Sequence, residues 1–254
     1  MFDLKGRVAI VTGGNGGIGL GMARGLASAG ARVVIAARNA EKSRAAVDEL
    51  TRLGAAEPLA IEVDVADESS AASMVGQAAE RCGRIDVLVN NAGIQIRGKQ
   101  PQDYSLAEWH RILDTNLTSG FLCARAVHPV FKRVGGGKII NIGSLYSFFS
   151  SSTTAAYSAS KGGLVQFTKS LAVAWARDNV QVNAVLPGWI DTDLTRAGRQ
   201  HFPDLNDQVL RRTPAGRWGV IDDFAGIAVF LASGASDFIT GAVITVDGGY
   251  TVQG

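Results

Sequence analysis

A glycine-rich turn near the start of the chain joins an apolar strand to an apolar helix, and it constrains the fold more than any other feature. Residues 7–12 read RVAIVT, a β-branched run typical of a strand that is buried on both faces of a parallel sheet. The turn TGGNGGIG follows at residues 12–19, and apolar residues at helical spacing come next. Backbone N–H groups in such a turn can approach a pyrophosphate, and the dipole of the following helix favours that anion. The pattern therefore predicts a dinucleotide-binding α/β fold.

The alternation of strand and helix continues along the rest of the chain. Six further strand-like runs lie at residues 31–36, 59–65, 84–90, 138–143, 180–186 and 242–246, separated by segments of helical period. We expect about seven strands in one Rossmann-like, doubly wound parallel sheet with helices on both faces. The 254 residues, 46% of them hydrophobic, then form a single domain, because α/β folds often reach about 200–250 residues as one unit.

Composition excludes several classes of protein. The net charge is +2 and the charges are dispersed, so nucleic acid is not an expected partner. Cys82 and Cys123 lie in helix-like segments, which favours buried thiols in a reducing compartment, and the three histidines lack ligand spacing, so no metal is predicted. No apolar run approaches the length of about 18 residues that a membrane span needs. We expect a cytoplasmic protein without a membrane partner.

The residues after the second strand bear on the choice of cofactor. NAD sites usually carry an acidic side chain at this point to bind the adenine ribose, whereas this chain has Ala37, Arg38 and Asn39. Arg38 can pair with a 2′-phosphate, although an exposed loop arginine is the alternative reading. We therefore favour NADP(H) over NAD(H), which remains possible. Asp64 and Val65, at the end of the third strand, are placed to meet the adenine; capping of the next helix is the structural alternative for Asp64.

A serine, a tyrosine and a lysine near the fifth strand form a candidate catalytic group. Ser144 follows that strand, Tyr157 comes thirteen residues later, and Lys161 lies four residues beyond on the same expected helix. A nearby ammonium lowers the pKa of a phenol, which suits the phenol to proton transfer with an alcohol or carbonyl. Ser144 can donate a hydrogen bond to the same substrate oxygen. A lone pair of this spacing is more often a packing tyrosine and a solvated lysine, so the other motifs matter.

Two further segments complete the expected site. Asn116 is an isolated polar residue in a helix around residues 106–119, where it serves either as a structural hydrogen-bonding group or in a proton relay. Residues 188–214 are irregular in pattern and follow a strand end, so we expect them to form a substrate lid.

Taken together, the motifs resemble the short-chain dehydrogenase/reductase family, in its compact branch of roughly 250 residues. The resemblance covers nearly the whole chain and rests on these motifs: Thr12-Gly13-x-x-x-Gly17-Ile18-Gly19, Asp64-Val65, Asn90-Asn91-Ala92-Gly93, Asn116, Ser144, Tyr157-x-x-x-Lys161, Asn183, Pro187-Gly188 with Thr192, and Asp247-Gly248-Gly249.

The resemblance implies a role for each matching residue. Tyr157 exchanges the proton at the substrate oxygen, Ser144 orients that oxygen, Lys161 lowers the pKa of Tyr157 and binds the nicotinamide ribose, and Asn116 holds a water molecule that links Lys161 to solvent. The cofactor would contact a larger set of residues: Gly13, Asn15, Gly17, Ile18, Gly19, Arg38, Asp64, Val65, Asn90, Ala92, Gly93, Tyr157, Lys161, Pro187, Gly188, Ile190 and Thr192. The implied reaction is reversible hydride transfer between a nicotinamide and a secondary alcohol or ketone.

Two short segments also resemble those of sugar-acid dehydrogenases that act on gluconate-type substrates. They are residues 93–97, GIQIR, and residues 188–192, GWIDT. The resemblance suggests that Arg97 binds a carboxylate, and Gln95, Tyr146, Trp189 and His201 are further candidates for the substrate pocket by their position. An arginine in a solvated surface loop is the alternative reading of Arg97.

Two other functions stay open at this point. A 3-oxoacyl-thioester (acyl-carrier-protein) reductase would share the fold and the catalytic residues, and the basic residues of the lid, Arg196, Arg199, Arg211 and Arg212, would suit a phosphopantetheine carrier. A catalytically silent NAD(P)-binding sensor is the alternative from another class, although it would be free to lose residues that are all present here. By analogy with the family we expect a homotetramer that pairs the long helix of Tyr157.

Overall fold

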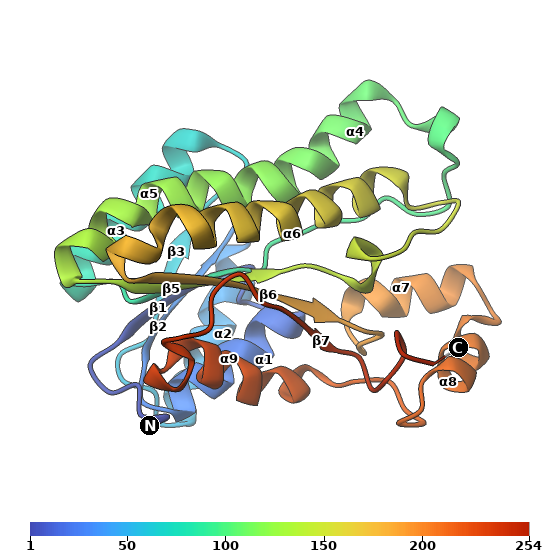
Figure 1. Ribbon diagram of the computed structural model, residues 1–254. Coiled ribbons are helices and arrows are strands. Elements are labelled where there is room, and N and C mark those ends of the chain that lie inside the picture. The colour runs from blue at the N-terminus through green and yellow to red at the C-terminus, as the bar shows by residue number, and fades with distance from the viewer. Residues whose placement is uncertain (254) are drawn as a thin grey trace.

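Seven parallel strands form one sheet in the order β3-β2-β1-β4-β5-β6-β7 (Figure 1). The computed structural model describes residues 1–253, and the side chains of all of these except Ala197, Gln200 and His201. The strands are β1 (Val8–Thr12), β2 (Arg32–Ala37), β3 (Leu59–Glu62), β4 (Val87–Asn90), β5 (Gly137–Ile142), β6 (Val180–Pro187) and β7 (Val243–Val246). This is the doubly wound sheet that the strand-like runs predicted.

Helices cover both faces of the sheet, as the alternating pattern requires. One face carries α1, α2 and α9, and the opposite face carries α3, α4, α5 and α6 (Figure 1). The helices are α1 (Gly17–Ser28), α2 (Ala40–Arg52), α3 (Glu68–Cys82), α4 (Leu106–Leu113), α5 (Ser119–Val134), α6 (Ala155–Trp175), α7 (Asp193–His201), α8 (Leu205–Arg212) and α9 (Ala225–Ala232).

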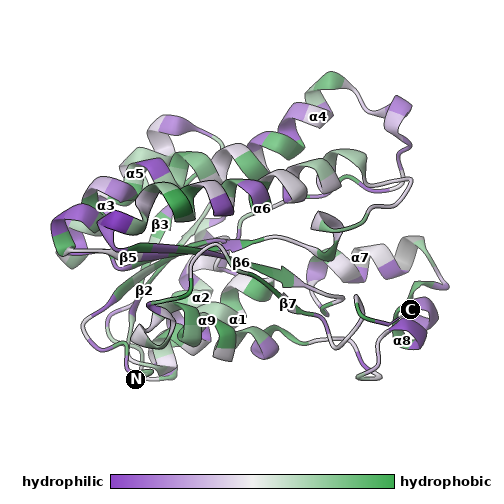
Figure 2. Ribbon diagram, viewed as in Figure 1, coloured by the Kyte–Doolittle hydropathy of each residue, from purple (hydrophilic) through white to green (hydrophobic). Residues whose placement is uncertain are grey.

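The central strand β1 is buried on both faces, and its side chains enter two separate cores. Val8 and Ile10 pack into the core beneath α3 and α5, whereas Ala9 and Val11 pack into the core beneath α1 and α9. Successive side chains of a strand point to opposite faces, so an uninterrupted apolar run is what a strand between two helical layers needs. In Figure 2 the hydrophobic colour accordingly follows the strands, and hydrophilic residues lie on the outer sides of the helices.

A glycine lets α1 pack closely against the start of α9. A Cβ atom at Gly25 would lie 2.6 Å from the backbone oxygen of Ala225, nearer than any side chain tolerates. The glycines of α1 therefore serve helix packing as well as the turn before the helix. This close contact fixes α1, and with it the glycine turn, against the rest of the fold.

The order of the strands determines where a ligand can bind. From β1 the chain moves outward to β2 and β3, and then returns across the sheet to β4 on the other side of β1. In open parallel sheets the connections that diverge at such a switch point leave a crevice at the carboxyl ends of the strands. The glycine turn, the end of β4 and the end of β5 all lie at that edge.

The structure corrects the prediction for residues 188–214. The segment had appeared irregular, but it contains the two short helices α7 and α8. Both are polar and no longer than nine residues, so their periodic signal is weak. The side chain of Thr192 accepts a hydrogen bond from the backbone N–H of Thr195, which caps α7 at its first turn.

The helix expected around residues 106–119 is also modified. It begins as α4 and continues into α5 through a π-helical turn, Asp114–Thr118, which carries Asn116. Such turns are frequent at functional sites. Within the described part of the chain, no helix is both long and apolar enough to cross a membrane.

Candidate active site

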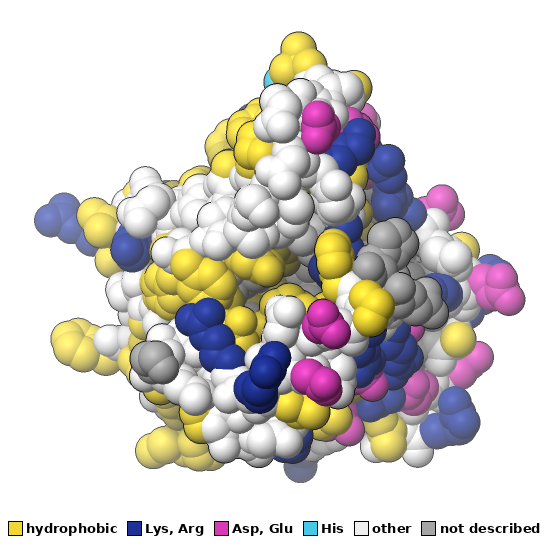
Figure 3. Space-filling model, turned by 90° about the vertical axis from the view of Figure 1, so that its right-hand side faces the viewer, with side chains coloured by type: hydrophobic (Ala, Val, Ile, Leu, Met, Phe, Trp, Pro, Cys, Tyr) yellow, Lys and Arg dark blue, Asp and Glu magenta, His cyan; other side chains and the backbone are white. Residues whose placement is uncertain are grey.

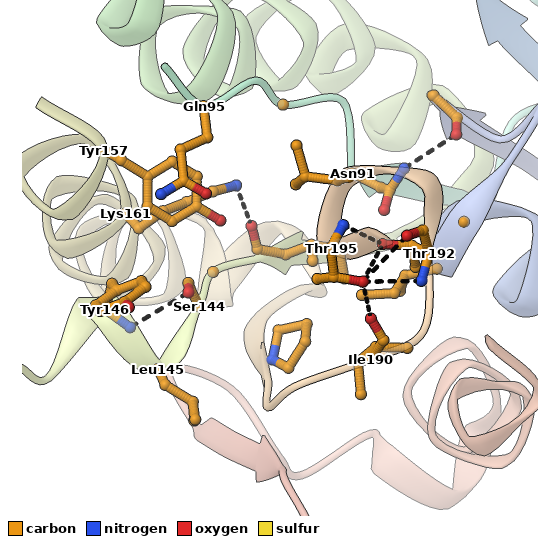
Figure 4. A pocket seen from close by; sticks show the side chains of 18 of the residues that line it. Asn91, Gln95, Ser144, Leu145, Tyr146, Tyr157, Lys161, Ile190, Thr192 and Thr195 are labelled. Atoms are coloured by element: carbon orange, nitrogen blue, oxygen red, sulfur yellow. Dashed lines mark hydrogen bonds between the residues drawn. The ribbon is translucent and has the colours of Figure 1, made fainter. Parts of the chain in front are cut away.

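A cleft of about 380 Å³ opens at the carboxyl ends of β1, β4, β5 and β6. This volume lies within the range of small-molecule sites. Figure 3 looks onto the end of the molecule that carries α7, α8 and the C-terminal segment, where hydrophobic side chains gather beside a hollow. In Figure 4 Ser144, Tyr146, Tyr157 and Lys161 lie on one side of the cavity, and Asn91 and Thr192 lie on the other.

The cleft gathers most of the residues that the sequence singled out. Those that line it are Gly13, Asn15, Gly17, Ile18, Ala92, Gly93, Gln95, Arg97, Ser144, Tyr146, Tyr157, Lys161, Pro187, Gly188, Trp189, Ile190 and Thr192. Six predicted residues are not among the lining residues, namely Gly19, Arg38, Asp64, Val65, Asn90 and Asn116.

The glycine turn has the form of a cradle for a phosphate-bearing ligand. Gly13 and Gly17 have φ angles of +62° and +52°, which residues with side chains rarely adopt. Gly16 precedes the first turn of α1 and supplies no side-chain cap, so the first N–H groups of the helix are not bonded by a capping side chain. These features fit the pyrophosphate of a dinucleotide.

Asn91 holds the glycine turn against the end of β4, and the sequence had pointed to its neighbour instead. The Asn91 amide donates to the backbone oxygens of Thr12 at 2.9 Å and Gly13 at 3.1 Å. Asn90, expected to contact the cofactor ribose, is 7% exposed and its side chain donates to Asn141 Oδ1 at 2.9 Å. The Asn90 side chain thus faces the interior and Asn91 lines the cleft, whereas a contact of Asn90 with the cofactor remains a prediction.

Three predicted adenine-side residues lie apart from the cleft, at the ends of β2 and β3. Arg38 is exposed and directly follows β2. Asp64 is also exposed, and its carboxylate accepts from the backbone N–H of Ala66 at 3.1 Å, while Val65 is buried. Asn15 reaches toward this region, since its amide donates to Ser43 Oγ of α2 at 3.1 Å. The cofactor contacts of these residues remain predictions.

Lys161 is fixed within α6 at the centre of the cleft. It is 3% exposed, and its Nζ donates to the backbone oxygen of Ile142, at the end of β5, at 2.7 Å. Burial lowers the pKa of Lys161 to about 8. A Cβ atom at Gly93 would lie 3.4 Å from this Nζ, so a glycine there leaves room for a ligand beside the ammonium.

Burial and nearby groups act in opposite directions on the pKa of Tyr157, and the expected influence of Lys161 on it remains a prediction. Burial raises the pKa of Tyr157, and the opposing influences are its hydrogen bond with Ser144 and the positive charge of Arg97. Lys161 Nζ lies 5.9 Å from the centre of the Tyr157 ring and is directed to Ile142. The ammonium is itself desolvated, and the positive charge of Arg97 also favours the phenolate.

Asn116 uses its amide to hold the loop that follows β4. Its Oδ1 accepts from the backbone N–H of Ile94 at 2.8 Å, and its Nδ2 donates to the oxygen of Ile94 at 2.9 Å and to Ser160 Oγ at 3.1 Å. Both N–H bonds are therefore used, and only the second lone pair of Oδ1 is left for a further partner. The placement favours a structural role, and a role in a proton relay remains a prediction.

Arg97 brings an uncompensated positive charge to the cleft. Its guanidinium donates to the backbone oxygen of Leu194 at 3.3 Å, and it makes no ion pair with a carboxylate among the described residues. Burial lowers the pKa of Arg97, although an arginine stays protonated in proteins. A half-buried cation without a carboxylate partner is suited to an anionic ligand.

Aromatic side chains form the wall of the cleft opposite the glycine turn. The ring of Tyr146 lies edge-on to those of Tyr157, Phe149 and Trp189, at centroid distances of 6.1, 5.6 and 6.4 Å. Phe149 was missed, although it lies within the same loop as Tyr146. Other lining residues that the sequence did not single out are Gly16, Ile142, Gly143, Leu145, Asp193, Leu194 and Thr195.

Thr195 shows what signal could have found part of this missed set. Its hydroxyl donates to the backbone oxygen of Ile190 at 2.5 Å, and Thr192 caps its N–H. A threonine at the cap position followed by an acidic residue in the first turn, as in Thr192-Asp193, is a helix-start signal. Applied to the apparently irregular segment, that signal would have placed α7 beside the cleft.

No group of three or more His, Cys, Asp or Glu residues that could hold a metal ion occurs within the described part of the chain. The polar side chains that line the cleft offer hydroxyl, phenol, ammonium and guanidinium groups.

Comparison with known proteins identifies relatives along nearly the full length of the chain. A family model described as Enoyl-(Acyl carrier protein) reductase matches residues 13–251. The 2-dehydro-3-deoxy-D-gluconate 5-dehydrogenase of Dickeya dadantii is 40% identical over 253 residues, which cover 99% of this chain and 98% of that protein. The gluconate 5-dehydrogenase of Gluconobacter oxydans is 39% identical over 253 residues, with coverage of 100% and 98%.

A solved structure shares both the sequence and the fold. It is a gluconate 5-dehydrogenase from Burkholderia cenocepacia in complex with NADP and tartrate, with a TM-score of 0.93, 42% identity, and coverage of 99% of this chain and 97% of that chain. The resemblance that the motifs indicated is confirmed by these full-length matches. The chain belongs to the short-chain dehydrogenase/reductase family.

Proposed function

We propose that the protein is an NADP-dependent oxidoreductase that interconverts a secondary hydroxyl group of a sugar acid and the corresponding ketone. The observation that carries this proposal is the guanidinium of Arg97, a cation without a carboxylate partner among the described residues, in the same cleft as Ser144, Tyr157 and Lys161. A substrate carboxylate offsets the cost of that desolvated charge, and a paired guanidinium and carboxylate form a strong, directional contact.

The names of the relatives support the same class of substrate. One is a gluconate 5-dehydrogenase and another is a 2-dehydro-3-deoxy-D-gluconate 5-dehydrogenase. The related crystal structure holds NADP together with tartrate, which is itself a hydroxylated acid. We infer from these relatives that the acid taken by this chain is of the gluconate type.

In the proposed reaction Tyr157 moves the proton and Ser144 holds the reacting oxygen. During oxidation the phenolate accepts the hydroxyl proton of the substrate, and during reduction the phenol returns it to the ketone oxygen. The Ser144 hydroxyl donates a hydrogen bond to that oxygen. A bound nicotinamide supplies the hydride acceptor or donor at the carbinol carbon.

Lys161 and Arg97 are the two positively charged side chains of the proposed site, and they bind different groups. Lys161 is anchored on the oxygen of Ile142, so its remaining N–H bonds are free for the nicotinamide ribose and the substrate side of the cleft. Arg97 binds the substrate carboxylate and favours the phenolate of Tyr157 through its charge. Asn116 maintains the loop of Ile94 that leads to Arg97.

The glycine turn would hold the pyrophosphate, and the ends of β2 and β3 would hold the adenosine. Arg38 is the proposed partner of the 2′-phosphate, because it is exposed, follows β2 and lacks an acidic neighbour in the residues directly beside it. Asp64 and Val65 would contact the adenine. Pro187, Gly188, Ile190 and Thr192 border the other end of the cleft and would meet the carboxamide.

The direct test measures oxidation of gluconate and of 2-dehydro-3-deoxygluconate at their hydroxyl groups with NADP or NAD. The absorbance of the reduced nicotinamide reports the rate. We expect turnover of at least one acid with the wild type and its loss in Tyr157→Phe, which keeps the ring and removes the exchangeable proton. Tight NADPH binding with no turnover of any acid or ketone would instead favour a cofactor-binding sensor.

Reduction of an acyl thioester is the second candidate, because the matching family model is described as Enoyl-(Acyl carrier protein) reductase. The lid arginines offer little support for a carrier dock. Arg196 and Arg199 are both paired with Asp191, and Arg212 lies over the ring of Tyr250 with its Cζ 4.5 Å from the centroid. Failure to reduce a 3-oxoacyl thioester under conditions that support sugar-acid turnover would exclude this candidate.

We also propose that the protein is a cytoplasmic homotetramer. Val173 of α6 is 82% exposed and Phe121 of α5 is 43% exposed, so these neighbouring helices carry apolar side chains that a subunit contact would cover. Free Cys82 and Cys123 suit a reducing compartment. Sedimentation equilibrium at micromolar concentration tests the assembly, and a monomer would contradict it.

A further inference from the structure

A small cavity, here called the annex, lies beside the main cleft and is bordered by residues from the start of α8. Its volume is about 80 Å³. Gln95, Arg97, Tyr146 and Trp189 border both the annex and the main cleft, so the two spaces meet along one wall. Thr153 borders the annex but not the main cleft, and Leu205 of α8 also borders the annex.

The annex collects polar groups that have unused hydrogen-bonding capacity. Neither the Gln95 amide nor the Thr153 hydroxyl makes a hydrogen bond to any described residue. The Arg97 guanidinium donates one hydrogen bond to a described residue, to the backbone oxygen of Leu194 at 3.3 Å. All three residues are half-buried, and a group of three polar side chains with spare hydrogen-bonding capacity around one cavity suits a polar ligand.

The loop that supplies Thr153 is held in a defined shape. Ser151 and Thr154, on either side of it, bond to each other: their hydroxyl oxygens are 3.0 Å apart, and the backbone N–H of Ser151 donates to Thr154 Oγ1 at 3.2 Å. Thr154 is 4% exposed. The turn therefore places Thr153 at the annex in a preorganised way, which lowers the entropic cost of binding.

The position of Arg97 is fixed from the side of the lid. A Cβ atom at Gly198 of α7 would lie 3.1 Å from the Cζ atom of Arg97, so the guanidinium packs directly against the backbone of that helix. Between this backbone and the wall shared with the main cleft, the charge of Arg97 is available to a group in the annex.

The annex is separated from the reacting groups. None of Ser144, Tyr157 and Lys161 borders it. Tyr146 stands between, because its ring contacts Tyr157 on one side and Trp189 on the other, at centroid distances of 6.1 and 6.4 Å. A group held in the annex is therefore kept away from the hydroxyl group that reacts.

Building on the proposed function, we propose that the annex is the subsite for the carboxylate end of the sugar acid, where Arg97 supplies the charge and Gln95 and Thr153 supply neutral hydrogen bonds. The hydroxyl that is oxidised then lies several carbons from the carboxylate, at Ser144 and Tyr157. A short acid whose hydroxyl groups all lie close to the carboxylate cannot place its carboxylate in the annex and a hydroxyl at Ser144 and Tyr157 together, so the site selects acids with a remote hydroxyl.

The test compares Thr153→Val, which removes one hydroxyl at nearly constant volume, with Ser152→Ala, a neighbouring exposed serine outside the annex. Both are assayed with gluconate, with the uncharged polyol sorbitol and with the short 2-hydroxy acid glycerate. Loss of one neutral hydrogen bond predicts a decrease of about 2- to 12-fold in kcat/KM for gluconate. The rate with sorbitol stays unchanged, glycerate is a poor substrate of the wild type, and Ser152→Ala behaves as the wild type does.

A second variant, Thr153→Met, fills the annex and should reduce gluconate turnover further while sparing sorbitol. Binding of gluconate to the NADP-loaded wild type and variants, measured by calorimetry, provides a readout apart from turnover. If both Thr153 variants match Ser152→Ala with every substrate, or if glycerate matches gluconate, the annex assignment is wrong. If the wild type neither binds nor oxidises any sugar acid, the proposed function itself fails.

Discussion

Replacing Arg97 with methionine should impair the use of acids far more than the use of neutral polyols. Methionine keeps an unbranched side chain of similar reach and removes the charge. In the structure Arg97 has one contact to a backbone oxygen, with Leu194, and no carboxylate partner among the described residues. Its removal therefore leaves no protein carboxylate unpaired, and the main loss falls on the ligand.

The size of the effect follows from the strength of one charged hydrogen-bonding pair. Such a pair contributes about 1.5–3 kcal/mol, which corresponds to a decrease of about 12- to 150-fold in kcat/KM for gluconate. Lysine at position 97 keeps the charge but lacks the planar fork, so Arg97→Lys should recover part of the activity. Stability should not fall, because the variant removes a desolvated cation.

A second readout comes from the pH dependence. The positive charge of Arg97 lowers the pKa of Tyr157 in opposition to burial, so Arg97→Met raises that pKa further. Oxidation needs the phenolate, and the rising part of the pH–rate profile should therefore move to higher pH with every substrate. The loss in kcat/KM at the optimum pH should be confined to acids.

The assay measures initial rates with gluconate and sorbitol across pH for the wild type, Arg97→Met and Arg97→Lys. Lys99→Met is the matched control, since Lys99 lies in the same loop, outside the cleft, and pairs with Glu108 at 2.5 Å. Equal losses with gluconate and sorbitol in Arg97→Met, each at its own optimum pH, would refute the role of Arg97 as a carboxylate anchor.

Three further predictions concern the cofactor, the buried lysine and the lid. Arg38→Ala should weaken NADPH binding and leave NADH binding unchanged in a fluorescence titration. The control Arg44→Ala, which changes an exposed residue of α2, should alter neither affinity. Equal NADPH affinities in the wild type and both variants would contradict the 2′-phosphate contact. Burial lowers the pKa of Lys161 from 10.5 to about 8, so between these pH values the unfolded chain binds more protons and stability rises with pH. Urea unfolding should show the wild type gaining up to about 3 kcal/mol relative to Lys161→Met across that window, and a flat difference would count against it. Gly198→Ala should displace the guanidinium of Arg97 by a few tenths of an ångström and raise KM for gluconate without changing NADPH binding; an unchanged KM would mean that the guanidinium has room to move.

The sheet could be predicted because the physical signals for it are local. A strand buried between two helical layers is mostly apolar, as β1 is up to Thr12, and β6 is buried along its whole length although it carries Gln181 and Asn183. The spacing of four residues between Tyr157 and Lys161 is also a local signal, and it placed both residues on one face of the same helix. The lid was harder, since α7 and α8 are short and polar, and the Thr192 cap of α7 was the main clue.

Other features of the site depend on three-dimensional packing that local patterns do not report. Asn90 and Asn91 are adjacent amides at a strand end, and the sequence alone did not decide which of them faces the cleft. The pKa of Tyr157 depends on burial and on Arg97, which is sixty residues away in the chain. The contact of Arg97 with the backbone of α7 likewise joins distant segments. These relations follow only from the folded arrangement.

The most direct test of carboxylate recognition compares gluconate with gluconamide as substrates of the wild type in the presence of NADP. The two molecules share the same hydroxyl groups and differ at the acid end in charge. We predict that kcat/KM is higher for gluconate by at least about tenfold, the effect of one charged hydrogen-bonding pair. Equal values for the two compounds, or a preference for the amide, would contradict the account of the site as a carboxylate-anchored oxidoreductase.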